Sequence, residues 1–339
     1  MAKVLITGAS GFIGLHLASA LATRGDEVTC LVRRTSQVNG LRHLGARLVY
    51  GDITEPESLT AAVAGQQFVY HLAGLTLALT KRHFFRVNQA GVHNIAQTCA
   101  AQSNPPILLV VSSLAAAGPA VGGQPKIESD PSLPVSSYGR SKRAGEQDAE
   151  LFADRVPTTI VRPPIVLGEG DRLGLPMFNS VDKFGIHIVP GLGRHRFSLI
   201  HADDLVELMI LAAERGKRLP PLGRNGSPAG QGYYFAACEE DLVYDDLGHL
   251  LGAALGRHKV FPLHIATPLV WTVAAAVEAL SQIERQPLYM HIDKAREVTA
   301  GSWICSPRQA REDLGFAVKA PIAERLRQTA QWYRNEGWL

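Results

Sequence analysis

A tyrosine and a lysine four residues apart, Tyr138 and Lys142, are the pair of side chains best suited to chemistry in this sequence. On a helix this spacing places both side chains on one face, one turn apart. A free phenol titrates near pH ~10, but a neighbouring ammonium favours the phenolate and makes the group useful as a general acid or base. The same pair is also typical of an ordinary exposed helix contact, so its interpretation depends on the surrounding elements.

The apolar run from Ile107 to Val111 predicts a central strand that is buried on both faces. It ends in Ser112 and Ser113, so we expect both hydroxyls at the carboxyl edge of a sheet, where α/β proteins bind ligands. Because side chains alternate along a strand, the two serines point to opposite faces. Two hydroxyls that merely end a strand are the alternative interpretation.

The first residues predict a dinucleotide site. Lys3 to Thr7 is typical of a strand, a glycine-rich turn follows at once, and apolar residues then recur with helical spacing up to Gly25. The first glycine permits a tight turn, the second lets backbone approach a pyrophosphate, and the third lets helix and strand pack closely. The start of the helix offers N–H groups to phosphate. The candidate contacts are Gly8, Ser10, Gly11, Phe12, Ile13 and Gly14.

Arginines stand where the second predicted strand, Glu27 to Val32, reaches the adenosine ribose. An acidic residue at this point would bind the ribose hydroxyls of NAD. Arg33 and Arg34 suit a 2′-phosphate instead, because guanidinium matches phosphate oxygens in a bidentate way. This favours NADP(H), while NAD(H) and a solvated basic loop remain alternatives.

Alternating strands and helices over this part of the chain predict an α/β fold with a Rossmann-type, doubly wound parallel sheet. We expect a dinucleotide-binding domain over residues 1–165, to which residues 195–215 return. Residues 166–339 are expected to form a smaller, mostly helical substrate lobe, partly interleaved with the first. Its helices are predicted at 175–184, from the Ile200–Asp204 segment through Glu214, and at 244–255, 266–283, 307–314 and 321–334, with a flexible loop at 217–231.

Composition excludes several function classes. The chain of 339 residues has 34 basic and 31 acidic side chains, a net charge of +3, which is no footprint for nucleic acid. The four cysteines are scattered without metal-ligand spacing, so we expect reduced thiols, no metal site and a cytoplasmic protein. Strand-like residues begin at Lys3, which leaves no room for a signal peptide.

One apolar run, Pro268 to Leu280, is too short to span a bilayer of ~20 residues and carries Glu278. A helix buried in the fold is the favoured interpretation. We therefore expect no membrane contact, with contact at a membrane surface as the minor alternative.

Several motifs in order make the chain resemble the extended short-chain dehydrogenase/reductases of the NAD-dependent epimerase/dehydratase type, over roughly residues 3 to 215. They are Thr7–Gly14, Asp52-Ile53-Thr54, His71-Leu72-Ala73-Gly74, Tyr138-x-x-x-Lys142, Arg162-Pro163-Pro164 and Ile200–Asp204. Val32-Arg33 looks most like the dihydroflavonol-reductase and 3β-hydroxysteroid-dehydrogenase members. The resemblance implies a catalytic triad of Ser113, Tyr138 and Lys142, a homodimer, and cofactor contacts from Asp52, Ile53, Leu72, Ala73, Gly74, Tyr138, Lys142, Pro163, Ile165 and Val166.

The reaction that the resemblance implies is hydride transfer between a nicotinamide and a carbonyl or secondary alcohol of a small, fairly apolar substrate. Ser113 would hydrogen-bond the substrate oxygen, Tyr138 would exchange its proton, and Lys142 would lower the pKa of Tyr138 and hold the nicotinamide ribose. Asn88 also matches a family position, for which a helix-ordering role and a catalytic role are both open, and Asp204 is expected to order the strand–helix junction. Leu75–Phe85 and Ala120–Val135 are expected to cover the cleft.

Two alternatives stay open: an NAD(P)-dependent epimerase of a sugar or sugar nucleotide, and a non-catalytic NADP(H)-binding sensor. Epimerases usually carry Tyr where this chain has Ala117, which favours a reductase. Arg194 or Arg196 could grip an anionic substrate, but a solvated basic loop is slightly favoured.

Overall fold

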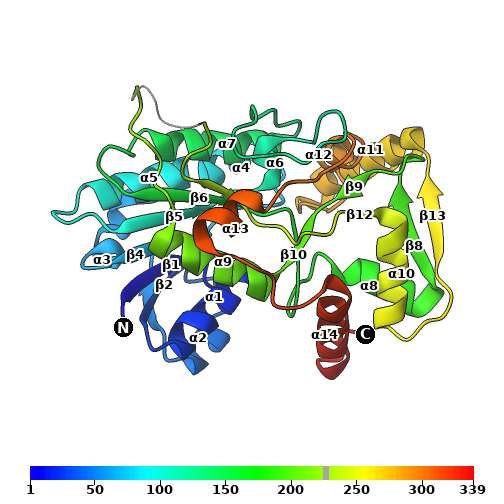
Figure 1. Cartoon of the computed structure of the whole chain (residues 1–339), viewed down its shortest axis with the longest axis horizontal. Helices are drawn as coiled ribbons and strands as arrows, with labels where there is room; N and C mark the ends of the chain where they lie inside the picture. Colours follow the sequence, from blue (N-terminus) through cyan, green and yellow to red (C-terminus); the bar gives the residue numbers. More distant parts are fainter. Residues whose placement is uncertain (224–228) are drawn as a thin grey trace.

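A seven-stranded parallel sheet forms the centre of the protein, in the order β11-β6-β5-β4-β1-β2-β3 (Figure 1). The computed structural model describes residues 1–223 and 229–339. The strands are β1 (Lys3–Thr7), β2 (Glu27–Val32), β3 (Arg47–Tyr50), β4 (Phe68–His71), β5 (Ile107–Val111), β6 (Thr158–Arg162) and β11 (Tyr233–Phe235). The chain order reverses at β1, with β2 and β3 on one side and β4 on the other. The crevice of a doubly wound sheet therefore lies at the carboxyl ends of β1 and β4.

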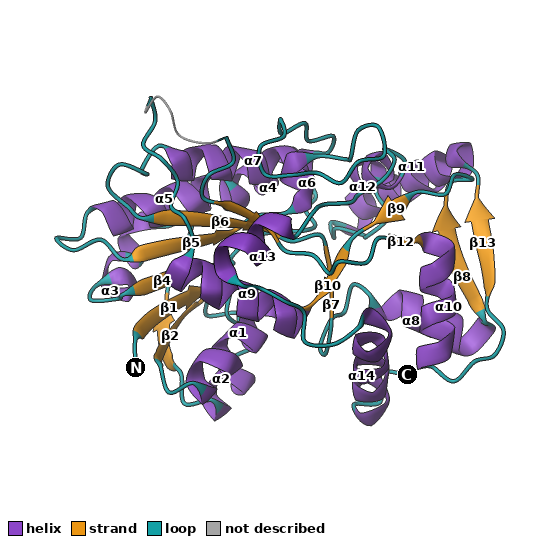
Figure 2. Ribbon diagram, in the orientation of Figure 1, coloured by secondary structure: helices purple, strands orange, loops and turns teal. Residues whose placement is uncertain are grey.

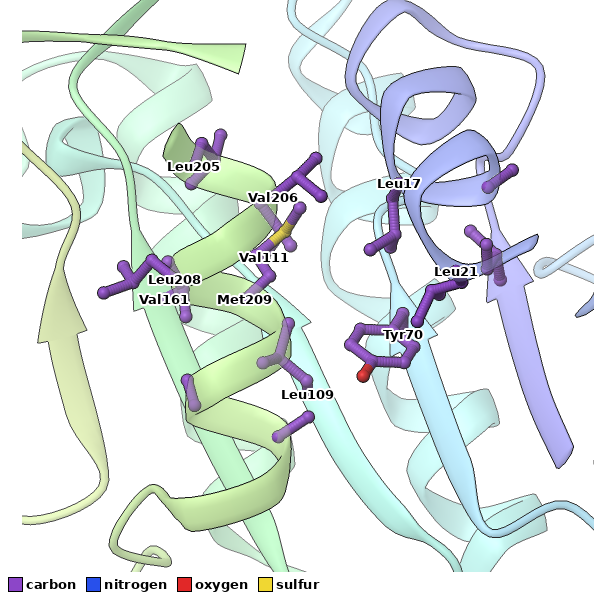
Figure 3. Close-up of a cluster of buried hydrophobic side chains, with 14 of the residues drawn as sticks. Leu17, Leu21, Tyr70, Leu109, Val111, Val161, Leu205, Val206, Leu208 and Met209 are labelled. Carbon is purple, nitrogen blue, oxygen red and sulfur yellow. The ribbon is translucent and has the colours of Figure 1, made fainter. Parts of the chain in front are cut away.

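Alternating side chains of the central strands build two separate cores, as expected for a sheet that is covered on both faces. On one face, Leu109 and Val111 pack with Leu17 of α1 and Met209 of α9 (Figure 3). On the other face, Leu108 and Val110 pack against helices α5 and α7. The continuous apolar run in β5 is thus used on both sides.

The helices around this sheet, together with one short 3₁₀ turn, cover its two faces, and two of them come from later in the chain. They are α1 (Phe12–Thr23), α2 (Asn39–His43), η1 (Pro56–Ser58), α3 (Thr60–Val63), α4 (Lys81–Asn88), α5 (Ala90–Ala100), α6 (Leu114–Ala117), α7 (Ser137–Glu150), α9 (Ala202–Arg215) and α13 (Arg308–Leu314). Helices α4, α5 and α7 pack on one another, while α1 packs on α9 on the opposite face. This is the Rossmann-type arrangement predicted from the sequence.

The second lobe is built mainly from residues after β6. It contains β7 (Ile165–Leu167), α8 (Leu175–Phe184), β8 (Ile186–Pro190), β9 (Arg196–Phe197), β10 (Leu199–His201), β12 (Leu242–Val243), α10 (Tyr244–Ala254), β13 (Phe261–Ile265), α11 (Thr267–Glu284), α12 (Ile292–Val298) and α14 (Ile322–Asn335). Its core includes Phe178, Leu251 and Leu326. A buried ion pair between Asp204 of α9 and Arg325 of α14, at 2.6 Å, joins this lobe to the sheet. Asp204, expected to order the strand–helix junction where α9 begins, thus joins α9 to α14.

The predicted helices of the second lobe are confirmed to within about one residue at each end. Of the predicted flexible loop at 217–231, residues 224–228 lie outside the described residues. The interpretation of the Pro268–Leu280 run was wrong in one respect. The run does form a helix, α11, but only Val270, Ala274 and Ser281 of that helix are buried. Hydropathy alone cannot tell a buried apolar helix from one that lies on the surface.

Candidate active site

Tyr138 stands in the first turn of α7, and two side chains, Ser136 and Asp293, fix where that helix begins. Ser136 is the N-cap and accepts a hydrogen bond from the amide of Gly139 at 2.9 Å. Asp293 of α12 accepts from the amides of Ser137 and Tyr138, at 2.8 and 3.1 Å. Free amides at a helix start are thus satisfied by a residue that is distant in the sequence.

Ser113 is the N-cap of the short helix α6 and accepts from the amide of Ala115 at 3.1 Å. Helix α6 can approach α7 closely because Gly139 has no side chain: a Cβ there would lie 2.3 Å from the carbonyl oxygen of Ala115. This packing brings Ser113 to Tyr138. Burial raises the pKa of Tyr138, and the nearby hydroxyl of Ser113 opposes the rise. The phenol therefore stays protonated and has a hydroxyl as its immediate partner.

Lys142 lies one turn further along α7, and its ammonium is buried. It donates to the carbonyl oxygen of Val111, at 2.7 Å, at the end of the strand that carries Ser113. Burial lowers the pKa of Lys142 to about 8, against the opposing charge of Glu146. A Cβ on Gly74 would lie 3.6 Å from the same ammonium, so the end of β4 passes directly beside Lys142.

Asn88 ties the end of β4 to α7. Its side-chain amide accepts from the amide of Leu75 at 2.7 Å and donates to Leu75 and to Ser141, at 3.0 and 2.9 Å. Asn88 is buried. It thus fixes the backbone next to Gly74 relative to α7, which is the helix-ordering role considered for it.

Helix α12 brings residues to Tyr138 that the sequence did not reveal. The ammonium of Lys294 donates to Glu297 at 3.0 Å and lies 5.5 Å from the ring centre of Tyr289. Glu297 in turn accepts from Ser136 at 2.6 Å. After burial and Ser113, the charges that act on the pKa of Tyr138 are those of Glu297, which raises it, and Lys294, which lowers it. The second lobe therefore contributes a cation, Lys294, whose charge opposes the rise in the pKa of Tyr138.

A buried ion pair holds α7 against the sheet below these residues. Arg162, at the end of β6, donates twice to Glu146, at 2.8 and 2.6 Å. The guanidinium also lies 4.4 Å from the ring centre of Tyr233. Such a pair is strongly destabilising to break, because the remaining charge would be buried alone.

The glycine-rich turn between β1 and α1 has the form that a dinucleotide requires. Gly8 has φ +73, and a Cβ on it would lie 2.6 Å from the amide nitrogen of Ala73. A Cβ on Gly14 would lie 2.2 Å from the carbonyl oxygen of Gly8, so helix and turn touch only because this residue is glycine. Ser10 and Gly11 are exposed, and Phe12 and Ile13 are half-buried. Backbone at the start of α1 is therefore open to a phosphate.

Arg33 and Arg34 follow β2 directly, and both are exposed. The amide of Arg33 donates to Ser36 at 3.1 Å, and the guanidinium of Arg34 lies 5.8 Å from the ring centre of Tyr50. After β3, Asp52 accepts two hydrogen bonds from Thr54, at 2.8 and 2.9 Å. Ile53 is buried beside Gly91. The predicted adenosine-side residues thus follow two adjacent strand ends.

The remaining predicted cofactor residues also lie at this edge of the sheet. Leu72 and Ala73 continue from β4, and the amide of Ala73 donates to Thr7 at 3.3 Å. The carbonyl oxygen of Pro163 accepts from Leu114 at 2.8 Å, next to Ser113. Ile165 and Val166 lie in β7 immediately afterwards. Residues from the glycine turn to Pro163 thus form one continuous line along the carboxyl edge, and they fit a bound dinucleotide.

The remaining expectations from the sequence concern two arginines, possible metal ligands and the cysteines. Arg194 is exposed, whereas Arg196 pairs with Asp241 at 3.3 Å and also donates to Gly123. Among the described residues, His16, Glu169 and Asp203 form a group with metal-ligand atom types. Both ring nitrogens of His16 face acceptors, the carboxylate of Asp203 and the carbonyl oxygen of Glu169, each at 2.8 Å, so a protonated His16 donates to both. All four cysteines are buried as free thiols.

Comparison with known proteins assigns the family. Residues 4–223 match the NAD dependent epimerase/dehydratase family. The chain belongs to this family. It is 32% identical to a ceramide reductase of Caulobacter vibrioides over 339 residues, covering 99% of this chain and 96% of that protein. It is 31% identical over 222 residues to the 4-hydroxy-2-methyl-3-oxo-4-farnesyl-3,4-dihydroquinoline-1-oxide ketoreductase of Stigmatella aurantiaca, covering 63% of this chain and 65% of the relative.

The fold comparison agrees. The UDP-glucose 4-epimerase of Thermotoga maritima, solved with UDP-glucose, superposes with a TM-score of 0.75 at 21% identity, covering 98% of this chain and 99% of that one. The predicted resemblance to the extended short-chain dehydrogenase/reductases and the predicted Rossmann-type fold are confirmed. The protein is an NAD(P)-dependent enzyme of the oxidoreductase or epimerase type. In the described part of the chain, every helix falls short of the length and apolarity that crossing a membrane requires.

Proposed function

We propose that this enzyme is an NADP(H)-dependent reductase that transfers hydride between nicotinamide and a carbonyl or secondary alcohol of an apolar, hydrocarbon-bearing substrate. The observation that carries the proposal is the placement of Ser113 against Tyr138, with Lys142 one turn below beside Gly74. Two relatives support the reaction, since both are named as reductases and their names specify a ceramide and a farnesyl-bearing ketone.

In this proposal Ser113 orients the substrate oxygen and Tyr138 transfers a proton to it. The dinucleotide, when bound along Gly11, Gly74 and Pro163, supplies the hydride. Ser113 donates a hydrogen bond to the substrate oxygen as negative charge develops on it. Tyr138 gives its phenolic proton to that oxygen in reduction and takes it back in oxidation. Burial raises the pKa of Tyr138, so the phenol is protonated at neutral pH, and a nearby cation is needed to make that proton transferable.

Two lysines supply the positive charge that the reaction requires: Lys142 holds the cofactor, and Lys294 stabilises the phenolate. Lys142 lies on the Gly74 side of Tyr138, where it would hold the nicotinamide ribose and stay anchored by Val111. Lys294 lies on the α12 side, where its charge favours the phenolate that proton donation leaves behind. Substrate oxygen would thus meet a donor network that has a cation on each side.

Two observations favour NADP(H) and a reductase over an NAD-bound sugar-nucleotide epimerase. Arg33 and Arg34 are exposed at the ribose end of β2, where they are free to meet a 2′-phosphate. Arg196, a candidate for binding a diphosphate, is engaged by Asp241. The homodimer remains a prediction from the family resemblance.

The test is spectroscopic. We expect purified protein to oxidise NADPH in the presence of long-chain aliphatic ketones, including a keto analogue of ceramide, with one alcohol formed per NADPH. Tyr138→Phe should lower kcat by about 10²-fold or more, because it removes the proton donor while leaving the ring in place. Phe84→Leu, which changes only the ring packed 6.0 Å from Tyr138, is the matched control and should cost far less.

Cofactor choice is tested on the same assay. Arg33→Ser together with Arg34→Ser should lower the NADPH-to-NADH preference by about tenfold to a hundredfold, since charge-assisted hydrogen bonds are worth roughly 1.5–3 kcal/mol. Arg47→Ser, on the neighbouring strand, is the control. Product formed from a sugar nucleotide with no net change in cofactor would instead support an epimerase. Unchanged activity in Tyr138→Phe across the panel would refute the triad.

A further inference from the structure

Helix α11 presents a row of large apolar side chains to solvent. Its apolar stripe is defined as Leu269, Val273, Ala276, Leu280 and Ile283, which recur at intervals of four and three residues and so share one face. Leu269 is 51% exposed, Val273 44%, Leu280 44% and Ile283 79%. Trp271, two residues from Leu269 and therefore on a different face of the helix, is 37% exposed. Contiguous exposed apolar surface of this kind marks an interaction site.

The stripe lies roughly a third of a turn around α11 from the side that packs on the fold. Val270 and Ala274 face inward and pack with Ala295 of α12. Figure 2 shows α11 at one end of the molecule, beside α12 and the ends of β8 and β13. The helix is thus held by its inner face alone.

The C-terminal end of α11 contacts the segment that leads into α4, which carries basic residues. The side chain of Gln282 donates to the carbonyl oxygen of Leu79 at 3.2 Å, so this end of α11 abuts the segment that leads into α4. Lys81, Arg82 and Arg86 of α4 are all exposed. An apolar helix face next to exposed cations is the pattern of a helix that lies in the interface of an anionic membrane.

The same surface continues toward the site. Tyr289, in the connection from α11 to α12, is 45% exposed, and the ammonium of Lys294 lies over its ring. Asp293, one residue before Lys294, accepts a hydrogen bond from the amide of Tyr138 at 3.1 Å. The connection from α11 to α12 thus leads to the start of α7, which carries Tyr138.

We propose that α11 and the exposed cations of α4 dock the enzyme on an anionic lipid surface, from which a lipid substrate enters. The enzyme lies on the surface rather than through it, because α11 does not meet the requirements for spanning a membrane. This revises the expectation of no membrane contact toward its minor alternative. Only the purpose of docking rests on the proposed function; binding itself is measured without turnover.

The experiment is flotation of the full-length protein with vesicles of phosphatidylcholine alone, or of equal parts phosphatidylcholine and phosphatidylglycerol. We expect binding to the anionic vesicles that weakens as salt is added. Leu280→Glu with Ile283→Glu should lower the partition coefficient by about tenfold or more, because two apolar side chains no longer enter the interface. Leu222→Glu, which changes a leucine that is 61% exposed on the loop after α9, is the matched control and should bind as the native protein does.

The cations are tested separately. Arg82→Gln with Arg86→Gln should reduce binding to anionic vesicles roughly thirtyfold, about fivefold for each charge near the surface. Equal binding to both vesicle types, or binding that survives the Leu280→Glu and Ile283→Glu changes, would overturn the proposal.

A second copy of the chain is the other occupant that the stripe's spacing would suit. If the native protein dimerises, fails to bind vesicles and becomes monomeric on Leu280→Glu with Ile283→Glu, the stripe is a helix-pairing seam and the proposal fails. NADPH oxidation with a short, water-soluble ketone keeps the two proposals distinct. That activity should persist in the stripe variant, and its absence in the native protein would count against the reductase and not against docking.

Discussion

The ammonium of Lys142 is buried, and burial disfavours its charged form, which lowers the pKa of Lys142 to about 8. Because the folded pKa lies below the unfolded value of ~10.4, the charged form penalises folding below about pH 8, and the penalty is relieved as pH rises toward ~10.4. We predict that Lys142→Met abolishes turnover yet leaves the cofactor-free protein as stable or more stable at about pH 7, by up to the order of 3 kcal/mol.

Urea unfolding of the two proteins at about pH 7 and pH 10 measures this effect. The advantage of Lys142→Met should shrink at the higher pH, because only the native protein gains stability across that interval. A deficit in Lys142→Met of equal size at both values would mean that the hydrogen bond to Val111 and the packing of the side chain outweigh the charge.

At the scale of elements, α12 positions the start of α7. Burial opposes ionisation of Asp293, but hydrogen bonds from the amides of Ser137 and Tyr138 prevail and lower its pKa. We predict that Asp293→Ala costs about 1–3 kcal/mol of unfolding free energy, since two buried amides lose their acceptor. It should also lower kcat more than it raises KM for NADPH, because Tyr138 shifts while the glycine turn does not.

Asp293→Asn provides the graded control, because its amide keeps one acceptor oxygen. Its unfolding free energy and kcat should both fall between those of the native protein and of Asp293→Ala. If kcat is unchanged in Asp293→Ala while stability falls, the contact is structural only and α12 does not position Tyr138.

The same elements show what local sequence could and could not predict. The glycine turn, the buried strand ending in Ser113 and the periodic helices are encoded by neighbouring residues, so their existence followed from spacing. Helix α12 has seven residues and lacks a side-chain N-cap. Its role depends on Asp293 meeting amides 155 and 156 residues away, and that pairing leaves no local signal.

At the scale of the whole molecule, the class of the central sheet could be predicted from the sequence. The contacts that join the two lobes could not. Strand alternation implied the doubly wound sheet. The seventh strand, β11, has only three residues and follows a segment rich in proline and glycine, so it carried no strand signal. The Asp204–Arg325 pair that closes the second lobe onto α9 spans 121 residues. Such long-range pairings are decided by tertiary packing.

His16 joins α1 of the cofactor half to Asp203 of α9 and to Glu169 after β7. Burial lowers the pKa of His16, but the hydrogen bonds and charges of Asp203 and Glu169 outweigh it and leave the pKa raised. A raised folded pKa contributes stability that is complete below the unfolded value of ~6.5 and is lost as pH rises through the folded value.

We therefore predict that His16→Gln lowers Tm most near pH ~5.5, by the equivalent of about 1 kcal/mol, and much less near pH ~9. Thermal unfolding across this range is the measurement, and His43→Gln, on the exposed end of α2, is the control that should leave the profile unchanged. A loss of the same size at both ends of the range would show that His16 acts by packing edge-on against Phe12, and that its charge does not hold the two halves together.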